Sequence, residues 1–115
     1  MLTLYGLKAC DTCRKARQEI EKAGQTVEFV DVRDTPLSPD LIAKFARELG
    51  GGLINKRSTT WRELSENERN ASPEDLIARH PTVMKRPVIA NGLALTLGWS
   101  AETKAIHLGK SQSAS

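Results

Sequence analysis

The chain has 115 residues and a mass of 12.6 kDa, enough for one domain with a hydrophobic core and too few for two independent cores. With 39% hydrophobic, 27% charged and 4% aromatic residues, its composition is that of a soluble globular protein rather than a disordered one. Its formal net charge of +3, with Lys and Arg spread along the chain, argues against a dedicated nucleic-acid binder, so we expect no direct nucleic-acid partner.

The sequence predicts a cytoplasmic protein with no membrane partner. Its first ten residues, MLTLYGLKAC, lack the charged leader and the long apolar run of a signal peptide. No segment approaches the apolar length that spans a bilayer.

The first third of the chain predicts a strand, a helix and a second strand. Residues 2–5 form a short β-prone run that ends at Gly6. Apolar residues at helical spacing predict a helix over residues 12–23, with Gly24 as its stop, and the β-branched run 26–32 predicts the second strand. A β-α-β unit with a right-handed crossover follows from this order.

The middle of the chain predicts helices only. Ser38 or its neighbour caps a helix over residues 40–49, which the three glycines at 50–52 end. Trp61 and Leu64 have the spacing of one helical face, which indicates a second, short helix.

A third helix is expected in this middle segment, beginning after Ser72. Pro73 suits its first position, and the acidic residues that follow suit its first turn. Pro81 sets its end.

The last third predicts a β-hairpin and a helix. Residues 88–90 and 93–97 read as strands joined by a turn at residues 91–92, Asn-Gly. A helix is expected over residues 100–108, and the small polar residues 110–115 are expected to fray.

The element order β-α-β, helical insertion, β-β-α predicts an α/β protein with a thioredoxin-like fold and a mixed sheet. We expect residues 1–115 to form one domain. Its thioredoxin-like core would consist of residues 1–34 and 82–109, its helical insertion of residues 35–81, and its flexible tail of residues 110–115.

Both cysteines of the chain, Cys10 and Cys13, lie at CxxC spacing where the first helix is expected to begin. In a reducing compartment this spacing indicates redox chemistry or metal binding rather than a structural disulfide. A zinc site takes four ligands as a rule, and His80 and His107 do not match a common zinc motif, so we expect no metal. Two buried cysteines acting as small hydrophobic residues remain the alternative to redox chemistry.

The helix entrance predicts different roles for the two thiols. The amides at a helix N-terminus stabilise a thiolate at Cys10, and Lys8 and Arg14 add positive charge nearby. Cys13, one turn into the helix, is placed to attack a mixed disulfide on Cys10. We include Lys8 and Thr12 among the candidates for substrate or anion binding.

The strand-CxxC-helix order, together with INKRSTTWREL at residues 54–64 and MKRPVI at residues 84–89, resembles the arsenate reductase-like (ArsC/Spx/YffB-like) family of thioredoxin-fold proteins. The resemblance covers residues 2–108. The family includes glutaredoxin-linked arsenate reductases, Spx-type transcriptional regulators that bind RNA polymerase, and small members proposed to be glutathione-dependent thiol reductases. The last branch fits best.

The resemblance implies roles for residues of the cysteine loop. In the arsenate reductases an arginine follows the nucleophilic cysteine by four residues, which assigns Cys10 as nucleophile and Arg14 as that arginine. The family's histidine four residues before the cysteine is replaced by Gly6. The arsenate reductase motif is therefore half present.

The resemblance also implies anion-binding groups far along the chain. Two oxyanion-binding arginines of the family match Arg57 and Arg86, whereas the third would fall near Gly98, where the chain has none. Pro87 matches a proline that is typically cis and faces the active cysteine in this fold.

The leading functional hypothesis is therefore a thiol-disulfide oxidoreductase that uses glutathione as co-substrate and has no tightly bound cofactor. Its substrates would be thiols, disulfides or oxyanions, with glutaredoxin or thioredoxin as possible protein partners. The alternatives are an Spx-like redox-sensing regulator that binds the RNA polymerase α subunit, and a glutaredoxin-dependent arsenate reductase.

Overall fold

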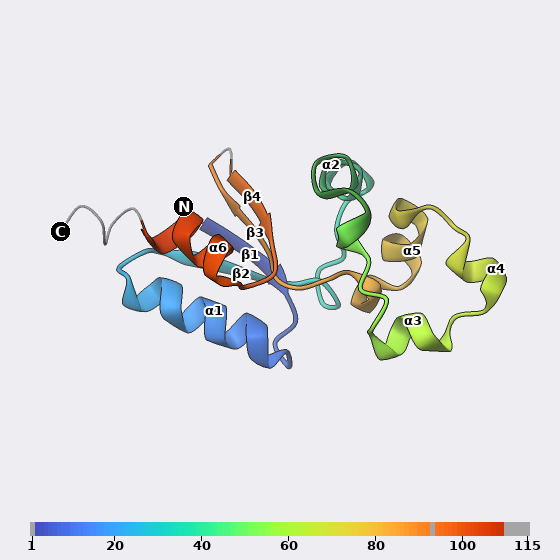
Figure 1. The fold of residues 1–115 in the computed structure, drawn as a ribbon, viewed down its shortest axis with the longest axis horizontal. Helices are drawn as coiled ribbons and strands as arrows, with labels where there is room; N and C mark the ends of the chain where they lie inside the picture. The colour runs from blue at the N-terminus through green and yellow to red at the C-terminus, as the bar shows by residue number, and fades with distance from the viewer. Residues whose placement is uncertain (1, 93, 110–115) are drawn as a thin grey trace. The chain divides into compact units, whose positions relative to one another are not determined.

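The computed structural model describes residues 2–92 and 94–109, shown in colour in Figure 1. The chain divides into two compact units, the first made of Met1–Asp31 and Arg86–Ser115 and the second of Val32–Lys85. The strands are β1 (Leu2–Gly6), β2 (Val27–Asp31), β3 (Val88–Asn91) and β4 (Ala94–Leu97). The α-helices are α1 (Asp11–Lys22), α2 (Pro39–Leu49), α3 (Thr59–Glu63), α4 (Glu66–Arg69), α5 (Pro73–Arg79) and α6 (Ala101–Lys104).

The first unit contains a four-stranded sheet in the order β2-β1-β3-β4. Strand β1 pairs with β2 in parallel and with β3 antiparallel, and β3 pairs antiparallel with β4. The parallel pair requires the crossover that α1 supplies. The structure thus confirms the predicted α/β class, the β-α-β unit and the mixed sheet.

One hydrophobic cluster joins α1 to the sheet of the first unit. Alternation along β1 turns Leu2 and Leu4 to the same face, where they are buried. Burial of each such side chain contributes about 1.5–3 kcal/mol. The rest of the buried cluster consists of Cys13, Ala16 and Ile20 of α1, Ile89 of β3 and Leu108 near the end of the chain. Because Cys13 belongs to this cluster, the packing of the core also fixes the cysteine motif.

The predicted hairpin turn is shifted by one residue. Asn91 pairs with Ala94, so it is the last residue of β3 rather than the first residue of the turn. Gly92 follows with a φ of 64°, a conformation that glycine adopts without strain. The predicted strand residue Leu93 and the predicted tail at 110–115 lie outside the described residues.

The helix predicted over residues 100–108 is present, but it changes from an α-helix to a π-helix along its length. Only Ala101–Lys104 is α-helical, and Ala105–Gly109 continues as a π-helical turn. Ser100 caps the first turn by accepting a hydrogen bond from the Thr103 amide.

Each α-helix of the second unit is capped by a serine. Ser38, Ser58, Ser65 and Ser72 each accept a hydrogen bond from a backbone amide three residues later. The helices predicted after Ser38 and Ser72 are confirmed, and the helix predicted around Trp61 is α3. Helix α4 was not predicted. Its signal is the capping box of Ser65 and Glu68.

No helix among residues 2–92 and 94–109 is both long and apolar enough to cross a membrane.

His107 is buried in the π-helical turn and is hydrogen-bonded to three residues from other parts of the first unit. Its Nε2 lies 2.8 Å from Oγ1 of Thr96, and its Nδ1 lies 3.5 Å from Nδ2 of Asn91. Its carbonyl oxygen accepts a hydrogen bond of 2.5 Å from Nε2 of Gln25. Burial lowers the pKa of His107 from its usual 6.5, so the neutral ring belongs to the folded state.

Acidification is expected to weaken the fold through His107. Because its pKa is lower in the folded chain, the unfolded chain takes up the proton first as the pH falls below 6.5. The stability from the neutral ring is therefore present above that pH and is lost as the pH falls toward the folded pKa. Urea unfolding at about pH 7.5 and about pH 5.5 should show a larger loss in the native chain than in His107→Gln. Equal losses would contradict this role.

Candidate functional site

Cys10 occupies the N-cap position of α1, at the end of a tight turn. Its backbone N–H donates a hydrogen bond of 3.0 Å to the carbonyl of Leu7, which closes the turn. Its carbonyl accepts from the amide of Arg14, the first bond of the helix. The half-buried Cys10 side chain packs against the edge of the hydrophobic cluster. The backbone of Cys10, which carries the thiol, is therefore held by a hydrogen bond at its amide and another at its carbonyl.

Cys13 lies beneath Cys10 and is fully buried, with 0% exposure. Its sulfur packs so closely on Gly6 that a Cβ at position 6 would collide with Sγ of Cys13. Burial and the neighbouring Cys10 sulfur together raise the pKa of Cys13 to about 12, against opposing contributions from the Leu7 backbone and Arg86. Cys13 is therefore a protonated thiol at neutral pH.

The pKa of the Cys10 thiol is shifted down. Partial burial acts to raise this pKa, but the backbone amide and the thiol of Cys13 and the side chain of Arg86 outweigh burial. The Cys10 side chain makes no capping hydrogen bond with standard geometry, yet the Cys13 amide, in the first turn of α1, still favours its thiolate. The two cysteines therefore differ in protonation as well as in exposure.

Arg86, which precedes Pro87 at the start of the second segment of the first unit, lies beside Cys10. The Arg86–Pro87 peptide bond is cis, as the family resemblance implied. The carbonyl of Pro87 accepts a hydrogen bond of 2.8 Å from the amide of Gly98, which joins the entry of β3 to the exit of β4. Half-buried Arg86 hydrogen-bonds the Cys10 sulfur and favours its negative charge.

Three further candidates lie around the cysteine loop. Lys8, Thr12 and Arg14 are all exposed. The Arg14 guanidinium pairs with the carboxylate of Asp11 on the same turn of α1. The cation that lowers the pKa of Cys10 is therefore Arg86, rather than the sequence neighbours Lys8 and Arg14 from which we expected this effect.

Arg57 belongs to the second unit. It is exposed, and its backbone amide donates a hydrogen bond of 3.0 Å to Oδ1 of Asn55. Its side chain helps to line an open pocket of about 720 Å³ that also includes Lys56 and Lys85. This pocket is cationic, which suits an anionic group.

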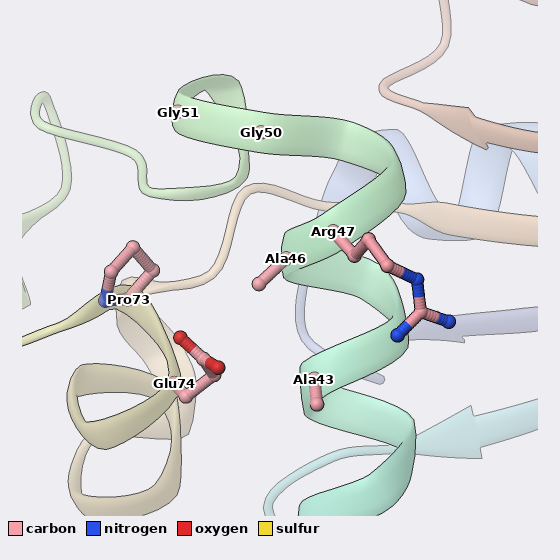
Figure 2. A pocket seen from close by; sticks show the side chains of 7 residues that line it. All are labelled: Ala43, Ala46, Arg47, Gly50, Gly51, Pro73 and Glu74. Carbon is pink, nitrogen blue, oxygen red and sulfur yellow. The ribbon is translucent and has the colours of Figure 1, made fainter.

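A second pocket of the second unit holds none of the candidate site residues. It has a volume of about 500 Å³ and lies between α2 and the start of α5. In Figure 2, Ala46 points toward the part of α5 that carries Pro73 and Glu74, whereas Arg47 points away. Its walls are largely alanine, glycine and proline, without a nucleophile, so we do not include it in the candidate site.

Comparison with known proteins decides the family. The model of the ArsC family matches residues 5–106. The chain belongs to the ArsC family. It is 32% identical over 105 residues to an uncharacterised protein of Haemophilus influenzae, an alignment that covers 87% of this chain and 92% of the relative.

Relatives within the ArsC family have different roles. This member is 32% identical to the global transcriptional regulator Spx of Bacillus subtilis, over 89% of this chain and 82% of Spx. It is also 27% identical to a YffB protein of known structure, with a TM-score of 0.86 and coverage of 94% of this chain and 99% of that one. The relatives therefore include an Spx-type regulator, and the predicted recognition of the family is confirmed.

The chemistry open to this ArsC-family member follows from its two free thiols. A thiolate at Cys10 is a nucleophile, and the protonated Cys13 beside it is a proton and hydrogen-bond donor. No group of three or more His, Cys, Asp or Glu side chains in the described part of the chain is placed to hold a metal ion. The sequence did not reveal that Gly6 leaves room for the Cys13 sulfur. Gly6 was expected only to end the first strand and to stand where the family has a histidine.

Proposed function

We propose that this protein is a glutathione-linked thiol-disulfide oxidoreductase with Cys10 as its nucleophile. The observation that carries the proposal is the half-buried Cys10 thiol at the N-cap of α1, with a pKa lowered by Cys13 and Arg86 against the opposing effect of burial. Such a thiol is both ionised more readily than a free cysteine and accessible, which are the two conditions for attack on a disulfide.

The proposed reaction begins when the Cys10 thiolate attacks one sulfur of a substrate disulfide. A bond forms between Cys10 and that sulfur, and the other sulfur leaves as a thiolate that takes up a proton. In the second step, Cys13 loses its proton and attacks the Cys10 sulfur, which forms the Cys10–Cys13 disulfide and releases the bound half of the substrate as a thiol; two glutathione molecules then reduce this disulfide and leave as glutathione disulfide. Where the mixed disulfide is one between Cys10 and glutathione, a second glutathione thiolate can instead attack the glutathione sulfur, which forms glutathione disulfide and frees Cys10. Two thiols are oxidised for each disulfide reduced, so atoms and electrons balance without a bound cofactor.

Cationic side chains would hold the carboxylates of glutathione. Arg86 lies at the nucleophile, and we assign Arg14 to substrate anions, with Lys8, Thr12 and the Pro87 backbone as further contacts. For Arg57, which belongs to the second unit, anion binding remains a prediction from the sequence. A guanidinium binds a carboxylate through two parallel hydrogen bonds, which suits a ligand that carries two carboxylates and a thiol. Glutaredoxin or thioredoxin could replace glutathione as the electron donor.

An Spx-like regulator is the second candidate. It is supported by the 32% identity to the Bacillus subtilis regulator, together with the CxxC motif at the start of α1, which resembles that of the Spx branch. Oxidation of Cys10 and Cys13 would then change affinity for the RNA polymerase α subunit. Retention of that subunit by the immobilised protein in one redox state only would favour the regulator, and no retention in either state would remove it.

Arsenate reduction has weaker support. Gly98, where the family's third arginine would fall, has a φ of 83°, a conformation that side-chain-bearing residues rarely adopt. The chain therefore offers two of the three oxyanion arginines.

Two parallel assays test the proposal. The purified protein is given glutathione and either a small mixed disulfide of glutathione or arsenate with glutaredoxin, and the glutathione disulfide formed is measured. We expect turnover with the mixed disulfide and little with arsenate. The proposed function would be refuted if the protein formed no glutathione disulfide from the mixed disulfide and Cys10 were not alkylated at neutral pH.

A further inference from the structure

The middle of the turn that holds Cys10 is exposed, whereas Leu7 at its start is buried and Cys10 at its end packs against the hydrophobic cluster. Lys8 and Ala9, its two central residues, are both exposed. The bond from the Cys10 amide to the Leu7 carbonyl closes the turn but does not attach it to the sheet. The exposed middle of the turn is held to the sheet by a further contact.

Asp31 makes that contact. It is the last residue of β2 and lies opposite Gly6 in the parallel pairing of β1 and β2. Its Oδ2 accepts a hydrogen bond of 2.8 Å from the backbone amide of Lys8, 23 residues earlier in the sequence. A carboxylate that accepts from a backbone amide forms one of the stronger hydrogen bonds in proteins. The middle of the turn is therefore tied to the edge of the sheet.

The same turn determines the surroundings of both sulfurs. Leu7, at its start, contributes a backbone hydrogen bond to the Cys13 thiol. Cys10, at its end, lies close to the Cys13 amide and to Arg86. A shift of the turn by a fraction of an ångström would lengthen these contacts together, since all of them depend on where the chain enters α1.

We propose that Asp31 is a positioning residue for the Cys10 nucleophile, acting through its hydrogen bond to the Lys8 amide. This inference rests on the proposed function, because it takes Cys10 as the reacting thiol. Asp31 has two opposite effects: its hydrogen bond holds the turn, and its negative charge disfavours a nearby thiolate. The geometric effect is the larger of the two.

Three variants separate these effects. Asp31→Asn keeps an oxygen that accepts the Lys8 amide and removes the charge, whereas Asp31→Ala removes both. Glu28→Ala is the matched control, because it removes an exposed carboxylate from the same strand without touching the turn. Far-ultraviolet circular dichroism and thermal unfolding check that each variant folds.

The measurement is the rate of alkylation of Cys10 by iodoacetamide against pH, with the modified peptide identified by mass spectrometry. In Asp31→Ala we expect the midpoint of the profile to move to higher pH and the rate near pH 7 to fall by about threefold or more. Glu28→Ala should follow the native profile, and Asp31→Asn should follow it or lie at slightly lower pH, because it keeps the hydrogen bond and loses the charge. A purely structural role would lower the unfolding temperature and leave the profile of the folded protein unchanged.

Three results would overturn the inference. They are a native profile in folded Asp31→Ala, an equal loss in Asp31→Asn, and a faster reaction in Asp31→Ala, which would make the charge the larger effect. Failure of the proposed function looks different, because the native protein itself would then titrate like a free cysteine. A low midpoint in the native protein with no change in Asp31→Ala refutes only the role of Asp31.

Discussion

Cys10→Ser is expected to lower disulfide reduction by at least about a thousandfold, because a serine hydroxyl is not ionised at neutral pH and is a poor nucleophile toward sulfur. Cys10 is half-buried at the start of α1, so the smaller oxygen fits the site and the fold should be retained. The measurement is glutathione disulfide formation with a glutathione mixed disulfide as substrate, at equal concentrations of folded protein.

Cys13→Ala is the matched variant. It deletes a sulfur that is buried in the cluster and has a pKa raised to about 12 by burial. We expect it to keep measurable turnover, since a second glutathione can resolve the mixed disulfide on Cys10. Turnover by Cys10→Ser above a tenth of the native rate, or alkylation of Cys13 in preference to Cys10, would contradict the assignment of the nucleophile.

Arg86→Ala is expected to raise the pKa of Cys10 and to slow its alkylation at neutral pH by on the order of tenfold, the value of one lost hydrogen bond to a charged group. The cause is the loss of both the hydrogen bond and the positive charge that Arg86 gives to the sulfur. At a pH above the pKa of an ordinary thiol, the alkylation rates of the native protein and the variant should converge, because Cys10 is then ionised in both proteins.

Arg17→Ala provides the control for Arg86→Ala. Arg17 is an exposed arginine of α1 that pairs with Glu21 at 3.5 Å. Removing Arg17 changes the net charge by the same amount as removing Arg86, but Arg17 is not among the groups that shift the pKa of Cys10. If Arg17→Ala shifted the alkylation profile as much as Arg86→Ala, net charge rather than the local contact would control Cys10.

The sequence predicted those features of the fold that depend on local patterns. The hydrophobic spacing of α1, the serine caps before α2 and α5, and the alternation of β1 all specify their elements within a few residues. The π-helical turn at Ala105–Gly109 has no such pattern. Pairing of Asn91 with Ala94 depends on the register of two strands rather than on the Asn-Gly dipeptide alone.

The candidate site was predictable where it depends on the start of one helix. The CxxC spacing and the position of Cys10 before α1 follow from the sequence, as does the contrast between the two thiols. The identity of the cation does not, because Arg86 reaches Cys10 through strand pairing and not through sequence proximity. The contacts of Gly6 with Cys13 and of Asp31 with Lys8 likewise join residues that only the folded sheet brings together.

The groups around the two sulfurs come from two segments that are far apart in the sequence. Cys10, Cys13, Arg86 and the carboxylate of Asp31 all come from the first unit, which Met1–Asp31 and Arg86–Ser115 build. The internal segment Val32–Lys85 can therefore change in sequence without replacing any of the residues that lower the pKa of Cys10.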